Sequence, residues 1–276
     1  MRHRRLLLAV PALALVFVLP TAGGPTPGAR PAVAATAVQS LPSPVQSVSA
    51  EPVIAVPEAP AHLPTLDYFK PAPHGFPADL AAQSTEPIGQ ALRPAVKLAA
   101  YDAPGGKALA YLGSTISGVP LVVPIVDERG GWRAVLLPSV NRRIGWVPPT
   151  GWETVPLRDL LVVHRKAHTL TWSRDGALYR TWKVGLGTRQ TPTPLGRTFV
   201  IARSTLKGRV YAGADVLALG AIPDTGLRGA HIGIHAWYDP SVVGRDISDG
   251  CIRLPRDQQK QLLDQVGPGT PVVVLP

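Results

Sequence analysis

The sequence predicts a mainly β fold, in which a small β-barrel precedes a larger β domain that carries one short helix. Two observations lead to this prediction. From about residue 96 onward, short runs of alternating apolar and polar residues recur, separated by Gly, Pro and Asp, as is typical of strands joined by turns. Near the C-terminus, the stretch PRDQQKQLLDQV has the spacing of an amphipathic helix.

The N-terminus has the composition of a secretory signal peptide. The basic MRHRR is followed by the apolar stretch LLLAVPALALVFVLP, which is shorter than the roughly 20 residues that span a bilayer. Small residues that suit a cleavage site occur up to Ala34. We therefore expect a signal peptide over residues 1–34 and export to the cell envelope, with an uncleaved membrane anchor as the alternative.

Residues 35–92 are rich in Ala, Pro, Ser and Val and show neither a helical nor a strand period. Such a composition does not bury a core, so we expect a disordered tether here. The short stretch LDYFKPAPHGF is an ordered patch at most.

Residues 93–156 predict a small β-barrel domain. The segments VKLAAYDAPGGKALAYL and VPLVVPIVDERGGWRAVLLP each predict two strands around a turn, and RRIGWVPP predicts another strand. The arrangement of GGWRAVLLP and GWV resembles bacterial SH3-like domains. Trp132 and Trp146 are expected in the barrel core, with a ligand groove as the alternative.

Residues 157–276 predict the second β domain. LLVVH, HTLTW, ALYRTWKV, TFVIAR and TPVVVLP predict strands, and HTLTW and ALYRTWKV form a hairpin around SRDG. Pro255 starts the predicted helix and Gly267 ends it. Its expected apolar stripe consists of Leu262, Leu263 and Val266.

The chain has a single cysteine, Cys251, in the stretch DISDGCIRL. In an exported protein a lone cysteine forms no disulfide within its own fold, so it is either an inert core residue or a working thiol. Gly250 allows a close approach to it, and the N–H groups of Gly250, Cys251 and Ile252 are candidate oxyanion donors. His235 lies sixteen residues upstream, a spacing that permits a Cys–His pair and equally a structural cysteine.

A longer stretch resembles a known catalytic signature. IGIHAWYDPSVVGRDISDGCIRL is similar to the signature of the L,D-transpeptidase catalytic domain family, the YkuD type, over residues 157–276. The matching positions are His235, Pro240, Gly244, Ser248, Gly250, Cys251, Ile252 and Arg253. Upstream, VGLGTRQTPTPLG resembles a second family segment through Gly187, Thr193, Pro194 and Gly196.

The resemblance implies a β-sandwich enzyme that acts on peptidoglycan stem peptides. Cys251 would attack the carbonyl of the third stem residue and expel the terminal D-alanine. An acceptor amine would resolve the thioester into a 3→3 cross-link. His235 would be the general base and acid, or the cation of a thiolate–imidazolium pair, held by the carbonyl of Ala236 or Trp237. The Gly250 and Cys251 N–H groups would bind the oxyanion, and carbapenem-type inhibitors would acylate the thiol.

The resemblance also implies substrate-binding residues, each with a structural alternative. Arg253 would hold a substrate carboxylate or form a buried salt bridge, and Ser248 would bond near His235 or serve as a turn residue. Trp237 would narrow the acyl pocket or offer a stacking face. Tyr211 and His231 would line the groove. The sequence predicts no cofactor, no metal site and no nucleic-acid partner, because the histidines are scattered and no basic run is interleaved with aromatics.

The sequence departs from the family pattern at two places. Asp249 stands where the family has a basic residue or His, and a carboxylate there would raise the pKa of the thiol unless it pairs with Arg253, Arg245 or a substrate ammonium. Ala236 and Trp237 stand where the family commonly has Gly-Thr. Two other functions therefore remain open: an L,D-carboxypeptidase that uses the same thiol with water, and a non-catalytic wall-binding protein.

Overall fold

The computed structural model describes residues 54–204, 215–220 and 232–276. They belong to one unit, Ala50–Pro276. The predicted signal peptide, residues 35–53 of the predicted tether, and the candidate site residues Tyr211 and His231 lie outside the described residues.

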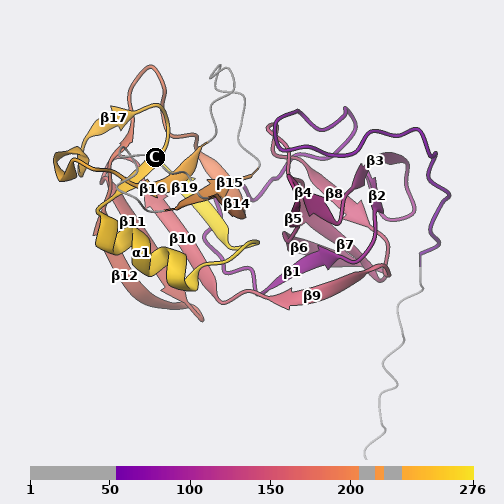
Figure 1. The fold of residues 1–276 in the computed structure, drawn as a ribbon. Helices are drawn as coiled ribbons and strands as arrows, with labels where there is room; N and C mark the ends of the chain where they lie inside the picture. The colour runs from indigo at the N-terminus through magenta and orange to yellow at the C-terminus, as the bar shows by residue number, and fades with distance from the viewer. Residues whose placement is uncertain (1–53, 205–214, 221–231) are drawn as a thin grey trace, which may run out of the picture. The chain divides into compact units, whose positions relative to one another are not determined.

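The first sheet is antiparallel and has the strand order β3-β2-β8-β7-β6-β1-β9 (Figure 1). The β2–β3 and β6–β7 hairpins are the two predicted from the turns at 103–106 and 127–131. The first and last strands of this region were not predicted. The strands are β1 (Gln90–Pro94), β2 (Leu98–Tyr101), β3 (Ala108–Leu112), β6 (Val123–Arg129), β7 (Trp132–Leu136), β8 (Ile144–Val147) and β9 (Trp152–Pro156), with a separate ribbon of β4 (Thr115–Ile116) and β5 (Val119–Pro120).

The two tryptophans of this region are core residues. Trp132 and Trp146 are buried and belong to one cluster with Tyr101, whose ring meets Trp132 edge-on at 5.0 Å between centroids. The indole N–H of Trp132 donates to the carbonyl of Ile54 at 3.1 Å. The core prediction for these tryptophans is therefore right.

The predicted disordered tether is wrong for residues 54–92. Within LDYFKPAPHGF, residues 66–76, where an ordered patch was expected at most, Leu66, Ala72 and Phe76 are buried in the core of the first sheet. Outside this stretch, the Tyr101 hydroxyl donates to the carbonyl of Pro57 at 2.6 Å, and the carboxylate of Asp79 is buried. This segment is held by single apolar side chains at irregular spacing and by backbone carbonyls that accept hydrogen bonds from side chains of the sheet. Neither feature produces a helical or strand period in the sequence, so the order of the segment could not be predicted. The segment is an extended part of the fold.

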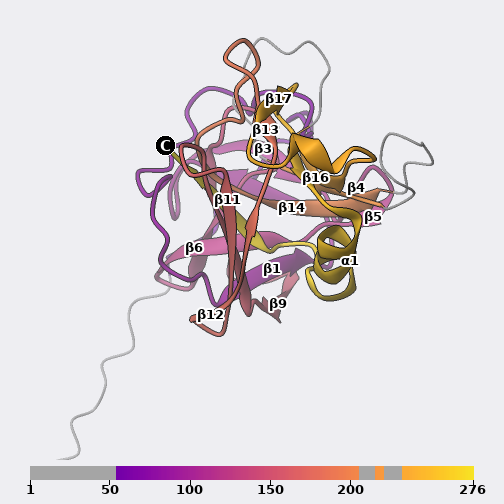
Figure 2. The ribbon, with the colours of Figure 1, turned by 90° about the vertical axis from the view of Figure 1, so that its left-hand side faces the viewer.

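The second sheet contains eight strands in the order β12-β11-β10-β19-β14-β15-β16-β18. Figure 2 labels β11, β12, β14 and β16 of this sheet together with the helix α1. The β11–β12 hairpin, α1 and the final strand occur where they were predicted. The strands are joined through β14, whose register shifts between Val200 and Ala202. One core cluster contains side chains from β10 and β11 as well as from β16 and β18, which stand far apart in the strand order. They are β10 (Asp159–His164), β11 (Thr169–Arg174), β12 (Ala177–Lys183), β14 (Gly196–Ser204), β15 (Val216–Leu219), β16 (Gly233–Ala236), β18 (Ile252–Leu254) and β19 (Pro271–Leu275).

The helix α1 (Arg256–Gln265) packs behind the strand that carries His235. It follows Pro255, and it buries Leu262 and Leu263 in the core of this sheet, as predicted. Gln259 is also buried, and its amide donates to the carbonyls of Ile234 at 2.9 Å and Asp215 at 3.0 Å. These bonds pin α1 to β16 and to the start of β15. Among the described residues, no helix is long and apolar enough to cross a membrane.

Candidate active site

Two neighbouring parallel strands bring the two halves of the signature together. β16 pairs with β18 so that His235 lies opposite Arg253 and Ile234 lies opposite Ile252. Side chains alternate between the faces of a strand, and Ile234 and Ile252 point into the core. His235 and Arg253 therefore share the other face. Cys251 directly precedes β18, and a hydrogen bond from the Gly233 backbone puts its thiol beside the start of β16.

The ring of His235 is fixed by its own main chain. The side chain is buried at 3% exposure, and its Nδ1 lies 2.7 Å from the carbonyl oxygen of Ala236. Because a carbonyl only accepts hydrogen bonds, Nδ1 carries the proton. Nε2 is then the atom able to accept a proton. Ala236 is one of the two carbonyls expected from the sequence.

Burial drives the pKa values of both candidate catalytic groups toward their neutral forms. It lowers the pKa of His235 to about 4, helped by the charge of Arg253 and opposed by the bond to Ala236. Burial also raises the pKa of the Cys251 thiol. A hydrogen bond from the Gly233 backbone and the charge of Arg253 lower this pKa, whereas the charge of Asp249 raises it further. The predicted effect of Asp249 has the right sign but is smaller than that of burial. Both shifts favour the uncharged forms of the two groups, the thiol and the neutral imidazole.

Ser248 braces the loop that carries the thiol. Its hydroxyl donates to the carbonyl of Cys251 at 2.6 Å and accepts from the N–H of Gly250 at 3.2 Å. Gly250 has φ +102°, in the left-handed region that favours glycine. The Gly250 N–H, a predicted oxyanion donor, here donates to Ser248, so an oxyanion would compete with the hydroxyl for this donor. Of the two roles expected for Ser248, the observed hydrogen bonds correspond to that of a turn residue.

The segment between β13 (Leu186–Gly187) and β14 is hydrogen-bonded to the same loop. The N–H of Thr188 and the hydroxyl of Thr191 both donate to the carbonyl of Ser248, each at 3.0 Å. β13 also pairs in parallel with β17 (Asp246–Ser248). The buried Thr193 accepts from the Gly187 N–H at 3.0 Å. The second family segment is thus a brace for the thiol loop, in which the roles of Thr188 and Thr191 were not predicted.

Arg253 is held at both its main chain and its side chain. Its N–H and carbonyl both bond with Gly185, at 2.8 and 2.9 Å. Its guanidinium lies over the Trp237 ring, 3.5 Å from the ring centroid, and Nη1 is 3.4 Å from the carbonyl of Ile247. The ring of Trp237 is in turn 5.8 Å from that of His235. The stacking alternative for Trp237 is therefore the one observed.

The start of β14 is anchored to the N-terminal segment. Arg197 and Asp79 form a two-bond ion pair, with N–O distances of 2.9 and 2.7 Å, and their side chains are only 8% and 2% exposed. Next to them, the guanidinium of Arg142 donates to the carbonyl of Leu195, and burial lowers the pKa of Arg142 to about 10. These contacts fix the end of the segment that braces the thiol loop.

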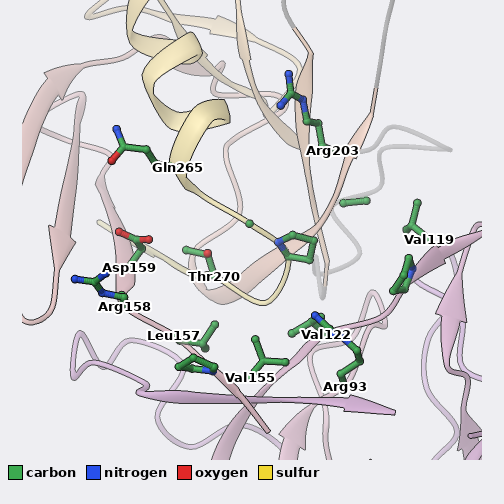
Figure 3. A pocket seen from close by; sticks show the side chains of 15 residues that line it. Arg93, Val119, Val122, Val155, Leu157, Arg158, Asp159, Arg203, Gln265 and Thr270 are labelled. Carbon is green, nitrogen blue, oxygen red and sulfur yellow. The ribbon is translucent and has the colours of Figure 1, made fainter. Parts of the chain in front are cut away.

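A separate cavity of about 620 Å³ is lined by residues of both sheets and contains none of the candidate catalytic residues (Figure 3). Three arginines line it, and each has a carboxylate partner: Arg93 with Glu153, Arg158 with Asp175, and Arg203 with Asp215.

Over the part of the chain that the structure describes, no group of three or more His, Cys, Asp or Glu residues could hold a metal ion.

Comparison with known proteins defines the class to which this fold and site belong. The model of the L,D-transpeptidase catalytic domain family, YkuD, matches residues 158–274. YkuD of Bacillus subtilis (strain 168) is 31% identical over 121 residues, which cover 44% of this chain and 67% of the relative. The chain belongs to the YkuD family of L,D-transpeptidase catalytic domains.

Two mycobacterial proteins are also similar. L,D-transpeptidase 1 of Mycobacterium tuberculosis (strain ATCC 25618 / H37Rv) is 26% identical over 215 residues, with 62% of this chain and 85% of the relative covered. The crystal structure of L,D-transpeptidase 3 from Mycobacterium tuberculosis, in complex with a faropenem-derived adduct, aligns with a TM-score of 0.37 and 18% identity. It covers 49% of this chain and 74% of that one.

Proposed function

We propose that this protein is an exported peptidoglycan L,D-transpeptidase that forms 3→3 cross-links through a thioester on Cys251. The observation that supports the proposal is the β16–β18 register, in which the buried His235 lies opposite Arg253, two residues after Cys251. The membership in the L,D-transpeptidase family supports the same reaction class.

In the first half-reaction, Nε2 of His235 takes the thiol proton as the sulfur of Cys251 attacks the carbonyl carbon of the third stem residue. The tetrahedral oxyanion collapses, the peptide bond to the terminal D-alanine breaks, and the imidazolium gives its proton to the leaving amine. A pair that is neutral at rest suits this sequence, because the proton moves only when the new bond forms. The product is a thioester and free D-alanine.

In the second half-reaction an acceptor amine, supplied by another stem, attacks the thioester carbonyl. His235 takes the amine proton and returns it to the sulfur, so the amide forms and the thiol is restored. We assign the Cys251 N–H as an oxyanion donor, worth about 3 kcal/mol, because the Gly250 N–H is bonded to Ser248. With water as acceptor, the same steps would trim a tetrapeptide to a tripeptide.

Product analysis tests the proposal. The full chain is incubated with a tetrapeptide stem donor and an excess of a stem that carries the acceptor amine, and the products are separated by mass. Cross-linked dimer together with released D-alanine supports transfer, whereas tripeptide alone identifies an L,D-carboxypeptidase. Cys251→Ala, which removes the nucleophile, should give neither product. If the parent protein also gives neither, the wall-binding alternative replaces the enzyme.

The proposal also covers the class of the domain that contains the first sheet and the export of the protein. We assign residues 93–156 to the SH3-like class and residues 1–34 to a signal peptide, so that the catalytic domain acts at the cell envelope. Fractionation of cells that produce the full chain tests export, since loss of residues 1–34 should leave the protein inside the cell.

A further inference from the structure

We propose that the cavity lined by both sheets binds a single-chain aliphatic anion, with Arg93 at its carboxylate or phosphate head and an apolar wall along its chain. The site is separate from the proposed reaction, because none of the described catalytic candidates lines the cavity. The proposal starts from the side chains that line it (Figure 3).

The cavity lies in a packed part of the fold. Phe199 and Ile201 of β14 are buried in the same core cluster as side chains of the first sheet, so side chains of the two sheets share a core. The cavity measures about 620 Å³, within the range of about 300–1,000 Å³ that is typical of small-molecule sites.

The lining is mainly apolar. Eight of the 15 described residues that line the cavity are Val, Leu, Ala or Pro. Val122, Val155 and Leu157 lie along the side that is drawn at the bottom of Figure 3. An aliphatic chain buried against such a wall should bind about fourfold more tightly for each added methylene.

The charged and amide side chains of the lining other than Arg93 are held by partners within the fold. The guanidinium groups of Arg158 and Arg203 each bond to a carboxylate at 2.5 Å. The carboxylate of Asp159 accepts from Arg174 at 2.8 Å, and the amide oxygen of Gln265 accepts from the same guanidinium at 2.5 Å. A peptide or a glycan needs many polar partners when it is buried. The lining therefore favours a ligand with one polar end.

Arg93 differs from the other two arginines in how loosely it is held. Its Nη1 is 3.8 Å from the carboxylate of Glu153, beyond hydrogen-bond distance, and the two side chains are 47% and 69% exposed. An exposed pair of this kind contributes little to stability, so an anionic ligand head can replace Glu153 in a shorter, two-bond contact.

The strand register places this arginine at one end of the apolar wall. Arg93 lies opposite Glu153 in the β1–β9 pairing, and Val155 is two residues beyond Glu153. Residues two apart in a strand share a face, and so do directly paired residues. Arg93 and Val155 are thus on one face, where a head bound to Arg93 leaves its chain over Val155.

Calorimetric titration of the full chain tests the proposal. The probes are decanoate and decyl phosphate, each kept below the concentration at which it forms micelles. Octanoate tests the effect of chain length, and decyltrimethylammonium has the same chain with a cationic head. The variants are Arg93→Ala and Glu153→Gln. Arg129→Ala is the matched control, because Arg129 is exposed, has an equally loose contact of 3.7 Å with Asp127 and does not line the cavity.

We expect the parent protein to bind one decanoate or one decyl phosphate, and the tighter of the two identifies the head group. Octanoate should bind about tenfold more weakly than decanoate, because two methylenes are lost. Decyltrimethylammonium should bind the parent protein at least about tenfold more weakly than decanoate, and Arg93→Ala should weaken decanoate binding by a similar factor, because each removes a charge-assisted contact. Glu153→Gln should tighten decanoate binding by about two- to fivefold, since the head no longer competes with a carboxylate. Arg129→Ala should bind as the parent protein does.

The proposal is overturned if neither anion binds the parent protein, or if Arg93→Ala binds both as tightly as the parent protein does. Equal affinities for octanoate and decanoate would also overturn it, because the apolar wall would then not hold the chain. None of these results affects the proposed reaction, which product analysis tests separately.

Discussion

The hydroxyl of Ser248 donates a 2.6 Å hydrogen bond to the carbonyl of Cys251 and also accepts the N–H of Gly250. One small side chain thus closes the loop that presents the thiol. Thr188 and Thr191 hold the main chain of Ser248 from the other side. The position of the thiol therefore depends on groups that need not touch the substrate.

Ser248→Ala should slow the acylation of Cys251 by about tenfold or more, because the variant removes both hydrogen bonds of the hydroxyl, to Cys251 and to Gly250. The loop can then move the thiol away from its reactive geometry. The variant should cost about 1–3 kcal/mol of unfolding free energy, since it leaves the Gly250 N–H without its buried acceptor. Stopped-flow acylation and urea denaturation measure the two effects. Ser241→Ala is the control, because Ser241 bonds only locally to the exposed side chain of Asp239. Equal acylation rates in the two variants would refute the bracing role.

Asp79→Ala should lower the free energy of unfolding by about 3–5 kcal/mol, because it leaves the buried guanidinium of Arg197 without its ion pair. The matched control is Asp264→Ala, which breaks the exposed pair with Lys260 and should cost about 0.5 kcal/mol or less. Urea unfolding curves of the two variants provide the comparison. A cost for Asp79→Ala no larger than that of the control would show that the N-terminal segment does not anchor β14.

Phe76→Ala should destabilise the fold by about 3 kcal/mol or more, the usual cost of a cavity left by a buried aromatic residue. Phe76 is 4% exposed, whereas Phe69 in the same segment is 48% exposed. Phe69→Ala should therefore change stability by much less, and thermal unfolding of both variants measures the difference. If both variants melt with the parent protein, residues 54–92 are a tether after all.

Unfolding free energy should fall as the pH drops from about 6.5 to about 4, in part through His235. The folded protein lowers the pKa of this residue to about 4, so between these values the unfolded chain binds a proton that the folded protein excludes. The stability is complete above the unfolded pKa of about 6.5, and about 3 kcal/mol is lost by pH 4. His235→Gln should remove this part of the pH dependence in urea titrations. His62→Gln, at an exposed site, should retain it, and identical pH profiles for all three proteins would contradict the burial of a neutral His235.

Much of the fold was predictable because its signals are local. The β11–β12 hairpin and the helix α1 follow from alternation, a turn sequence and an apolar stripe. The Cys251–His235 pair was found only through two matching motifs, because the β16–β18 pairing joins residues that are far apart in the sequence.

The bracing contacts gave no local signal. The bond from Thr191 to Ser248 spans 57 residues, and the pair Arg197–Asp79 spans 118. The order of residues 54–92 outside LDYFKPAPHGF was also missed, because isolated side chains such as Asp79 find their partners on other strands. The direction of the Gly250 N–H depends on the backbone conformation of this glycine, φ +102°. The sequence shows that glycine permits such a conformation but not that it is adopted.

The central claim is that Cys251 is the nucleophile, and one measurement tests it most directly. The full chain and Cys251→Ala are incubated with imipenem at neutral pH, and their intact masses are recorded over time. We expect a stable adduct of one imipenem on the parent protein and none on the variant. A parent protein that is folded yet gains no mass, or a variant that gains the same mass, would contradict it.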